Sequence, residues 1–402
     1  MIIYHAHTGT TLLNILNLKA NQMDDEISDI YISNSERMPQ ELIQFTRDSG
    51  LFRNVIVINP YLESISENHS NSSKLRFIIN KANKATSLLR VHQYYEKILS
   101  QSLSSNKCDI LITHGLWLSS PYIVNYFYSR NNALNLHIID EGIGTTNESF
   151  QVLTNPKRDE LSPTKFHKMV YDFFWFITTG RCCNQDIANF RNRFTDYYLY
   201  TPEYSRLYQE TSLIPHKLLP FDSNNKLTPL LGKLLEGINY DEYINRHVWI
   251  LSDNDVLESH PCHLTFKRIL EITLASFSQD DVILKGHPAL HLNEEYYSAS
   301  WSDLYLDNRK FQLEALYSMI NLDEKILITR TSSAVFYPKY MFNAEPSIIF
   351  TYKLLPNGIG IEAMDRLVAS LRGLYVEKER IHVPESLDEL SQCLKNPSNI
   401  LK

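Results

Sequence analysis

The stretch LHIIDEGIGTT, residues 136–146, gives the clearest signal of the fold and indicates where the chemistry lies. Its first four residues form an apolar run that is typical of a buried strand, and the run ends at two carboxylates, Asp140 and Glu141. In an open parallel sheet the carboxyl ends of the strands line the ligand crevice, so acids at this point favour a functional role. The chain has only 12 glycines in 402 residues. Gly142 and Gly144 would let the backbone turn sharply or lie close to a substrate.

The same pattern recurs on both sides of this stretch. Helical patterns such as residues 74–103 and 264–276 separate short runs that are rich in Ile and Val and end in polar residues, Gly or Pro. This alternation predicts βαβ units and parallel sheets. The predicted strands are residues 1–6, 29–33, 54–60, 108–115 and 136–142 in the first half, and 247–255, 281–288, 325–334 and 346–352 in the second.

A segment of different composition, residues 155–240, lies between the two sets of strands. It is first densely aromatic and then contains several prolines with few strand signals, which is typical of a domain end and a linker. The sequence therefore predicts an α/β protein of two Rossmann-like domains, residues 1–220 and 246–402, joined by a linker at 221–245. The last helix is expected to pack back on the N-terminal domain.

Composition excludes several classes of protein. A formal net charge of −7 argues against general nucleic-acid binding, which needs a basic surface to displace counterions. No apolar run reaches the roughly 20 residues that span a bilayer, and the N-terminus lacks the features of a signal peptide, so we expect a cytoplasmic protein. Five cysteines form no C-x-x-C pair and no Cys/His cluster, which favours reduced thiols and no structural zinc.

Polar residues at the predicted strand ends are the candidates for chemistry. Glu141 or Asp140 could serve as a general base, or could cap the next helix. His287, two residues after Lys285, could bind or protonate a phosphate leaving group, or be a capping or buried histidine. The hydroxyls of Thr331, Ser332 and Ser333 could form a phosphate cradle or an ordinary N-cap. The acids of SDND, residues 252–255, could hold a divalent metal, but solvated loop acids are the commoner reading.

Three of these motifs, in their order along the chain, resemble those of bacterial sialyltransferases. They are DEG at residues 140–142, HP at 287–288 and SS at 332–333. The families meant are the lipooligosaccharide sialyltransferases and the capsular polysialyltransferases, which use CMP-activated nonulosonic acids. The resemblance covers the domain plan of residues 1–375, and only the motifs match residue by residue. It implies a GT-B fold, in which two Rossmann-like domains turn their parallel sheets toward each other across a cleft.

The resemblance also implies a mechanism and the roles of residues. An acid of the DEG motif, preferably Glu141 rather than Asp140, would deprotonate the acceptor hydroxyl, while His287 acts on the CMP leaving group. The reaction would invert the anomeric centre of a nonulosonic acid without a metal or another cofactor. Residues expected around CMP are Lys285, Gly286, Pro288, Thr331, Ser332, Ser333 and Ser252. Residues expected on the acceptor side are Gly142, His7 and His114.

Other readings stay open at this point. HP and SS signals also occur in CDP-glycerol or CDP-ribitol transferases, and an HP motif occurs in CMP-Kdo transferases of capsule assembly. The former usually show Asp just before the serines, where this chain has Arg330 and Thr331. A non-catalytic glycan-binding subunit is the alternative outside the enzymes. The acceptor would be a surface glycan, and the aromatic-basic residues 165–181 suit either peripheral contact with an anionic inner-membrane surface, as for a lipid-linked acceptor, or a core helix.

Overall fold

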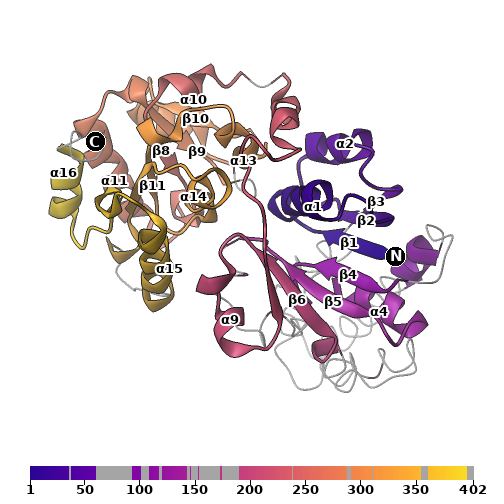
Figure 1. Cartoon of the computed structure of the whole chain (residues 1–402). Helices are drawn as coiled ribbons and strands as arrows, with labels where there is room; N and C mark the ends of the chain where they lie inside the picture. Colours follow the sequence, from indigo (N-terminus) through magenta and orange to yellow (C-terminus); the bar gives the residue numbers. More distant parts are fainter. Residues whose placement is uncertain are drawn as a thin grey trace, which may run out of the picture. The chain divides into compact units, whose positions relative to one another are not determined.

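The computed structural model divides the chain into two compact units, Met1–Leu218 and Leu219–Lys402 (Figure 1). Residues 221–245, for which the sequence suggests a linker, begin the second unit and carry the short helices η3 (Thr228–Leu235) and α10 (Asp241–Asn245). The structure describes residues 1–35, 38–59, 93–100, 108–116, 120–142, 145, 153, 173, 190–237, 239–287, 291–309, 311–354 and 361–395.

The first unit is built on a seven-stranded parallel sheet in the order β3-β2-β1-β4-β5-β6-β7. Strands are added outward from β1 to β3 and then, starting with β4, on the other side of β1. The direction in which the sheet grows therefore reverses between β1 and β4. Such a switch point is where ligands bind in open α/β sheets. The strands are β1 (Ile2–Ala6), β2 (Ser28–Ser33), β3 (Asn54–Ile58), β4 (Ile110–Thr113), β5 (Asn135–Ile139), β6 (Phe194–Leu199) and β7 (Ile214–Lys217).

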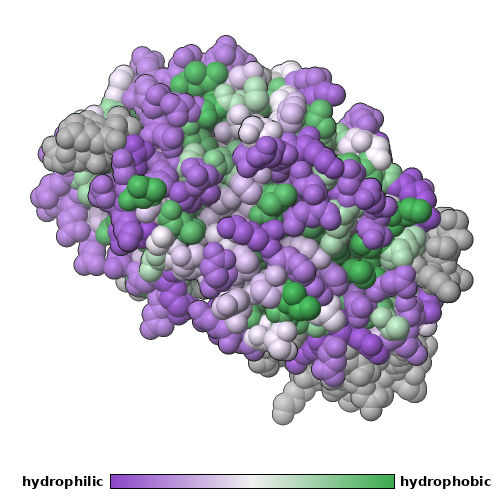
Figure 2. Space-filling model, viewed as in Figure 1, coloured by the Kyte–Doolittle hydropathy of each residue, from purple (hydrophilic) through white to green (hydrophobic). Residues whose placement is uncertain are grey.

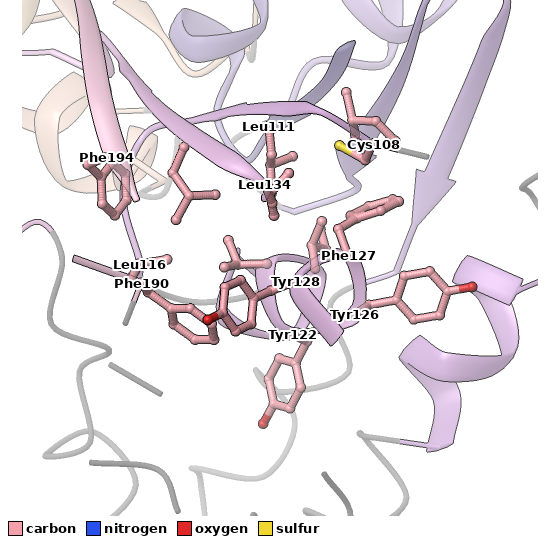
Figure 3. Packing of buried hydrophobic residues seen from close by; sticks show 14 of the residues in the cluster. Cys108, Leu111, Leu116, Tyr122, Tyr126, Phe127, Tyr128, Leu134, Phe190 and Phe194 are labelled. Carbon is pink, nitrogen blue, oxygen red and sulfur yellow. The ribbon is translucent and has the colours of Figure 1, made fainter. Parts of the chain in front are cut away.

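Helices cover both faces of this sheet. The helices α1 (Gly9–Gln22) and α2 (Gln40–Asp48) lie on one face and α4 (Ser120–Arg130) on the other (Figure 1). The sequence of α4, SPYIVNYFYSR, buries aromatic side chains against Leu111 of β4 and Phe194 of β6 (Figure 3). The ring of Tyr122 stacks on Tyr95 with centroids 4.9 Å apart. Burying such rings contributes on the order of 2 kcal/mol each. The short helices η2 (Pro202–Tyr204) and α9 (Arg206–Glu210) lie between β6 and β7.

The second unit has a six-stranded parallel sheet in the order β10-β9-β8-β11-β12-β13. Counted within the unit this is 3-2-1-4-5-6, the classic doubly wound order, with its switch point between β8 and β11. The strands are β8 (Val248–Leu251), β9 (Val282–Lys285), β10 (Tyr305–Asp307), β11 (Ile326–Thr329), β12 (Ser347–Phe350) and β13 (Ile381–His382). The helices are α11 (His263–Ser276), α12 (Glu294–Ser300), α13 (Leu313–Tyr317), α14 (Tyr337–Phe342), α15 (Ile361–Leu374) and α16 (Leu387–Lys395).

The predicted α/β class with two parallel-sheet, Rossmann-like domains is confirmed by these topologies. Each predicted strand is present, but β6, β7, β10 and β13 were missed because they are short or mix polar with apolar residues. The last described helix, α16, was expected to return to the N-terminal domain. Its Leu390 and Leu394 join the core of the second unit beside Phe266 and Leu270 of α11, because residues four apart share one helix face.

The surface is that of a polar protein in the view of Figure 2, where hydrophilic residues dominate and apolar residues form small groups. Among the described residues, no helix combines the length and the apolar character that a membrane-crossing segment requires. The aromatic-basic residues 165–181 lie outside the described residues except for Phe173, whose side chain is exposed.

Candidate active site

The acidic turn after β5 holds Asp140 through its own backbone and side chain. Its amide donates to the carbonyl of Tyr198 (3.0 Å), and its carbonyl accepts from Nδ2 of Asn14 (3.0 Å). Its carboxylate Oδ1 accepts from the amide of Gly142 (2.9 Å), which closes a tight turn. Gly142 has φ 140°, a conformation that favours glycine. Asp140 is buried and serves as a fixed corner of the turn.

Glu141 is placed differently from its neighbour. Its amide donates to Oγ1 of Thr145 (3.0 Å), and the amide of Thr145 donates to the carbonyl of Gly142 (3.1 Å). Its side chain keeps 14% of its surface exposed, and Oε2 lies 3.9 Å from Nε2 of His114. The turn therefore directs a partly exposed carboxylate toward the histidine that follows β4.

Three histidines cluster at the carboxyl ends of β1 and β4, the switch point of the first sheet. The ring centroid of His114 lies 5.7 Å from that of His5 and 5.9 Å from that of His7. His5 makes hydrogen bonds with the hydroxyls of Thr113 (3.2 Å) and Ser33 (3.2 Å). Burial lowers the pKa of His114 to about 3 and that of His5 well below its usual value. Both rings are therefore neutral at physiological pH, and His114 adjoins Glu141 as a neutral imidazole rather than as an ion-pair partner.

Adjacent strand ends also meet at the switch point of the second sheet. The register pairs Leu251 of β8 with Lys285 of β9 and with Thr329 of β11, so the residues after these strands share one edge. Asp253 fixes this edge, because its Oδ2 accepts from both the amide (2.9 Å) and the hydroxyl (2.7 Å) of Thr331. Ser252 donates from its amide (3.1 Å) and its hydroxyl (2.9 Å) to the carbonyl of Lys285. Asp253, which the sequence suggested as a metal ligand, thus holds in place the hydroxyl-rich loop of residues 331–333 through two hydrogen bonds; we call this pair of bonds the clamp.

The hydroxyl-rich loop begins the 3-10 helix η7 (Ser333–Val335). The amide of Ser332 donates to Oγ1 of Thr329 (3.1 Å), and its own Oγ accepts from the amide of Ala334 at 3.4 Å. Ser332 is therefore the N-cap of η7, which was one of the two roles that the sequence suggested for it. A hydroxyl that accepts one bond still has a hydrogen to donate, so the cap does not exclude a contact with an anion. Ser333 is half-buried at the first position of the turn.

The loop that carries His287 is held at both ends. The amide of Gly286 donates to the carbonyl of Asp307 (2.9 Å), and Oδ1 of Asn308 accepts from the amide of Leu292 (2.7 Å). A Cβ at Gly286 would lie 3.3 Å from Oδ1 of Asn308, so this close packing favours glycine. His287 itself is half-buried. Pro288 lies outside the described residues.

Lys285 lies inside the fold beneath this loop. Its ammonium donates to the carbonyl of Arg309 (2.6 Å) and, more weakly, to that of Gly286 (3.4 Å). Burial lowers the pKa of Lys285 to about 8, although nearby Asp307 acts in the opposite direction. In this arrangement the ammonium positions the backbone before His287.

Asp255 has a carboxyl group whose pKa is strongly raised. It is 4% exposed, in the 3-10 helix η4 (Asn254–Val256). Burial first and Asp253 second raise its pKa to about 6, whereas Arg330 acts to lower it. Perturbed carboxyl groups are enriched at functional sites. The sequence had suggested Asp255 only as a metal ligand. Within the described ranges, no three His, Cys, Asp or Glu side chains lie together as a metal site.

The raised pKa of Asp255 predicts a pH-dependent stability. The folded state binds the proton more tightly than the unfolded chain, so the proton stabilises the fold, and this stability is lost as pH rises from about 4 through about 6. We expect Asp255→Asn to raise the free energy of unfolding at pH 8 by up to about 3 kcal/mol and to have little effect at pH 4. Urea unfolding at both pH values measures this.

A matched control for this experiment is Asp303→Asn, because Asp303 is an exposed acid of the same unit. Its effect should be small at either pH. An Asp255→Asn variant whose effect is the same at pH 4 and pH 8 would contradict the prediction.

The structure groups the sequence-predicted residues into two sets. Asp140, Glu141, Gly142, His7 and His114 gather at the switch point of the first sheet. At or just after the ends of three neighbouring strands of the second sheet lie Ser252, Lys285, Gly286, His287, Thr331, Ser332 and Ser333. Sequence reasoning missed His5 and the clamp made by Asp253. Both residues lie at or near the end of a predicted strand, and this position could have marked them as candidates for the site.

Comparisons with known proteins give distant likenesses only. No protein-family model matches the chain, and no curated protein sequence is detectably similar to it. Among solved structures, the glycosyltransferase VinC in complex with dTDP is 13% identical with TM-score 0.45, covering 100% of this chain and 92% of that one. The UGT89C1 protein of Arabidopsis thaliana, complexed with UDP-L-rhamnose, is 10% identical with TM-score 0.47, covering 100% and 91%.

A third solved structure comes from Listeria monocytogenes and is assigned as a UDP-N-acetylglucosamine 2-epimerase. It is 10% identical with TM-score 0.49 and covers 100% of this chain and 89% of that one. Likenesses of this size leave the activity of the present chain to be inferred from its own residues.

Proposed function

We propose that the protein is an inverting glycosyltransferase of the GT-B type that moves a nonulosonic acid from its CMP-activated form to a hydroxyl of a surface glycan. The observation that carries this proposal is the acidic turn after β5. It fixes Asp140 as a structural corner and leaves Glu141 partly exposed, with its carboxylate 3.9 Å from the buried, neutral His114. A positioned carboxylate beside a neutral hydrogen-bonding group is suited to take a proton from an acceptor hydroxyl.

The donor half of the proposal rests on the second unit. The half-buried Ser332 and Ser333 supply hydroxyls at the switch point, where phosphate groups bind in doubly wound sheets. Thr331 donates its own hydroxyl hydrogen to Asp253 and so holds this loop in place. His287 follows the neighbouring strand β9 in a loop fixed at both ends. In the proposal the hydroxyls bind the CMP phosphate and His287 stabilises the charge that develops on it. Lys285 and Ser252 act indirectly by holding the backbone.

The proposed reaction is a single displacement. The acceptor oxygen forms a bond to the anomeric carbon as Glu141 takes the hydroxyl proton, and the bond from that carbon to the phosphate oxygen of CMP breaks. The bonding electrons leave with CMP, whose negative charge His287 and the loop hydroxyls balance, so the step requires no metal. His114 lies beside the base and His7 lies next to His114, and in the proposal both contact the acceptor. A lipid-linked glycan at the cytoplasmic side of the inner membrane is the proposed acceptor.

A panel of activated donors tests the function directly. The full chain is incubated with an oligosaccharide acceptor and, in turn, CMP-sialic, CMP-legionaminic and CMP-pseudaminic acids, CMP-Kdo, CDP-glycerol, CDP-ribitol, UDP-glucose and dTDP-glucose, and nucleotide release is measured. We expect CMP release from a nonulosonic donor that depends on the acceptor. Release of CDP from a polyol donor, or of UDP or dTDP, without CMP release would overturn the donor assignment. A Glu141→Gln sample measures the background of nucleotide release that does not depend on the proposed general base.

A further inference from the structure

Arg330 is a charged residue at the donor edge that neither the motifs nor the proposed mechanism uses. It directly follows β11, at the level where Ser252 follows the neighbouring β8. Its side chain is half-buried, and its Nε and Nη1 atoms are shielded from solvent without a hydrogen-bond partner in the described part of the chain. Unpaired buried donors are costly, especially on a charged group. A guanidinium in this condition is suited to receive acceptor oxygens from a ligand.

Asp255, which acts electrostatically on Arg330, is an acid that also lacks part of its hydrogen bonding. Asp255 is buried, and its Oδ1 has no hydrogen-bond partner among the described residues. The two side chains influence each other electrostatically, but no ion pair joins them in the structure's described part. Asp255 therefore does not take the Nε and Nη1 donors of Arg330, which can bind an anion.

The start of α11 lies in the same neighbourhood. Arg330 acts on the imidazole of His260, whose Nδ1 accepts from the amide of Cys262 (3.2 Å). Cys262 is the N-cap of α11 and makes no side-chain cap bond. In doubly wound folds the first helix after the first strand presents its N-terminus to phosphate, and α11 is that helix in this unit. The cationic side chain, the uncapped helix and the switch point favour the same kind of ligand.

We propose that Arg330 binds the phosphate of the nucleotide donor and that the buried carboxyl group of Asp255 is its counter-charge when no anion is bound. This deepens the proposed function and rests on it for the identity of the nucleotide. It also gives a reason for a basic residue directly before Thr331. Charge-assisted hydrogen bonds from a guanidinium to a phosphate are among the strongest in proteins.

Asp255 makes the binding depend on pH. When Asp255 is ionised it repels the anion and competes for Arg330, and when it is protonated the guanidinium charge is available to the ligand. Since its pKa is about 6, Asp255 opposes binding at pH 8 and does so much less at pH 5. The other titratable or charged groups that act on it or contact it are Asp253, His263, Tyr297 and Arg330, with His260 and Glu258 next to them.

The experiment is isothermal titration of the full chain with CMP, cytidine and inorganic phosphate. Wild-type protein should bind CMP at least tenfold more tightly than cytidine. We expect Arg330→Gln to weaken CMP by about 10- to 100-fold and to leave cytidine unchanged, because only the phosphate loses its partner. Arg366→Gln, on the exposed face of α15, is the matched control and should bind CMP as wild type does. Equal weakening of CMP and cytidine, or no weakening, would overturn the inference.

A second variant keeps the inference testable if Arg330→Gln does not fold. Asp255→Asn should bind CMP several-fold more tightly than wild type at pH 8, and the ratio of the two affinities should approach one at pH 5. A ratio that stays constant between these pH values would refute the role of Asp255. Phosphate binding that depends on Arg330 in a protein that fails to use CMP donors would support the anion site and reject the proposed donor. Turnover of a CMP donor by the wild-type protein, together with unchanged CMP binding in Arg330→Gln, would support the proposed donor and reject the anion site at Arg330.

Discussion

Replacing Glu141 with glutamine should reduce kcat for glycosyl transfer by about 10²- to 10⁴-fold while the acceptor KM changes little. The amide has nearly the shape of the carboxylate but cannot take the proton of the acceptor hydroxyl, and general-base catalysis contributes about this much. The fold should persist, because the described backbone bond of Glu141 runs from its amide to Thr145 and does not involve the carboxylate. Initial rates of CMP release with saturating donor measure the effect.

Asp140→Asn is the informative comparison, because Asp140 is the neighbouring acid of the same motif. An asparagine oxygen can still accept from the amide of Gly142, so the turn should form and most activity should remain. Glu210→Gln, on exposed α9, controls for the chemical change itself. A large loss in Asp140→Asn with full activity in Glu141→Gln would assign the base to Asp140, and unchanged turnover in both would show that the base lies elsewhere.

Replacing His287 with alanine should lower kcat by about 10²-fold or more, because the departing phosphate loses a group that balances its charge. The defect should extend to the slow hydrolysis of the donor without acceptor, since the same bond to CMP breaks in both reactions. Loss of Glu141 alone affects the acceptor side. Comparing transfer and hydrolysis in the two variants therefore separates a donor-side role from an acceptor-side role.

His291→Ala is the matched control for His287, because His291 is an exposed histidine that follows in the same connection between β9 and α12. We expect it to keep wild-type kcat within about twofold. If His287→Ala slows transfer but leaves donor hydrolysis at the wild-type rate, His287 does not act on the leaving group. Circular dichroism and thermal unfolding of each variant verify that the fold is retained.

Most of the architecture could be predicted from the sequence because the central strands are continuous runs of large apolar residues. A strand that is covered on both faces needs such a run, and β4, β8, β9, β11 and β12 show it, while β1 and β5 each include one histidine among apolar residues. The strand β7, IPHK, is largely exposed at the end of its sheet, and β13 has two residues, so neither carries the pattern. The helix α16 packs on α11, a neighbour that the sequence did not indicate, because an apolar helix face does not specify its partner.

The order of residues along the chain shows that acids, a histidine and hydroxyls follow buried strands, because the end of an apolar run can be read directly from the sequence. It did not determine which of them are committed to the fold. Asp253 meets Thr331 across 78 positions of the chain, and Asp140 is fixed partly by Asn14 of α1. Hydrogen bonds and burial between distant segments arise only when the sheet assembles. Tertiary contacts therefore show that Asp140 shapes the turn while Glu141 stays partly exposed. They also show that the buried Asp255 and the half-buried Arg330 each have side-chain polar atoms without a hydrogen-bond partner among the described residues.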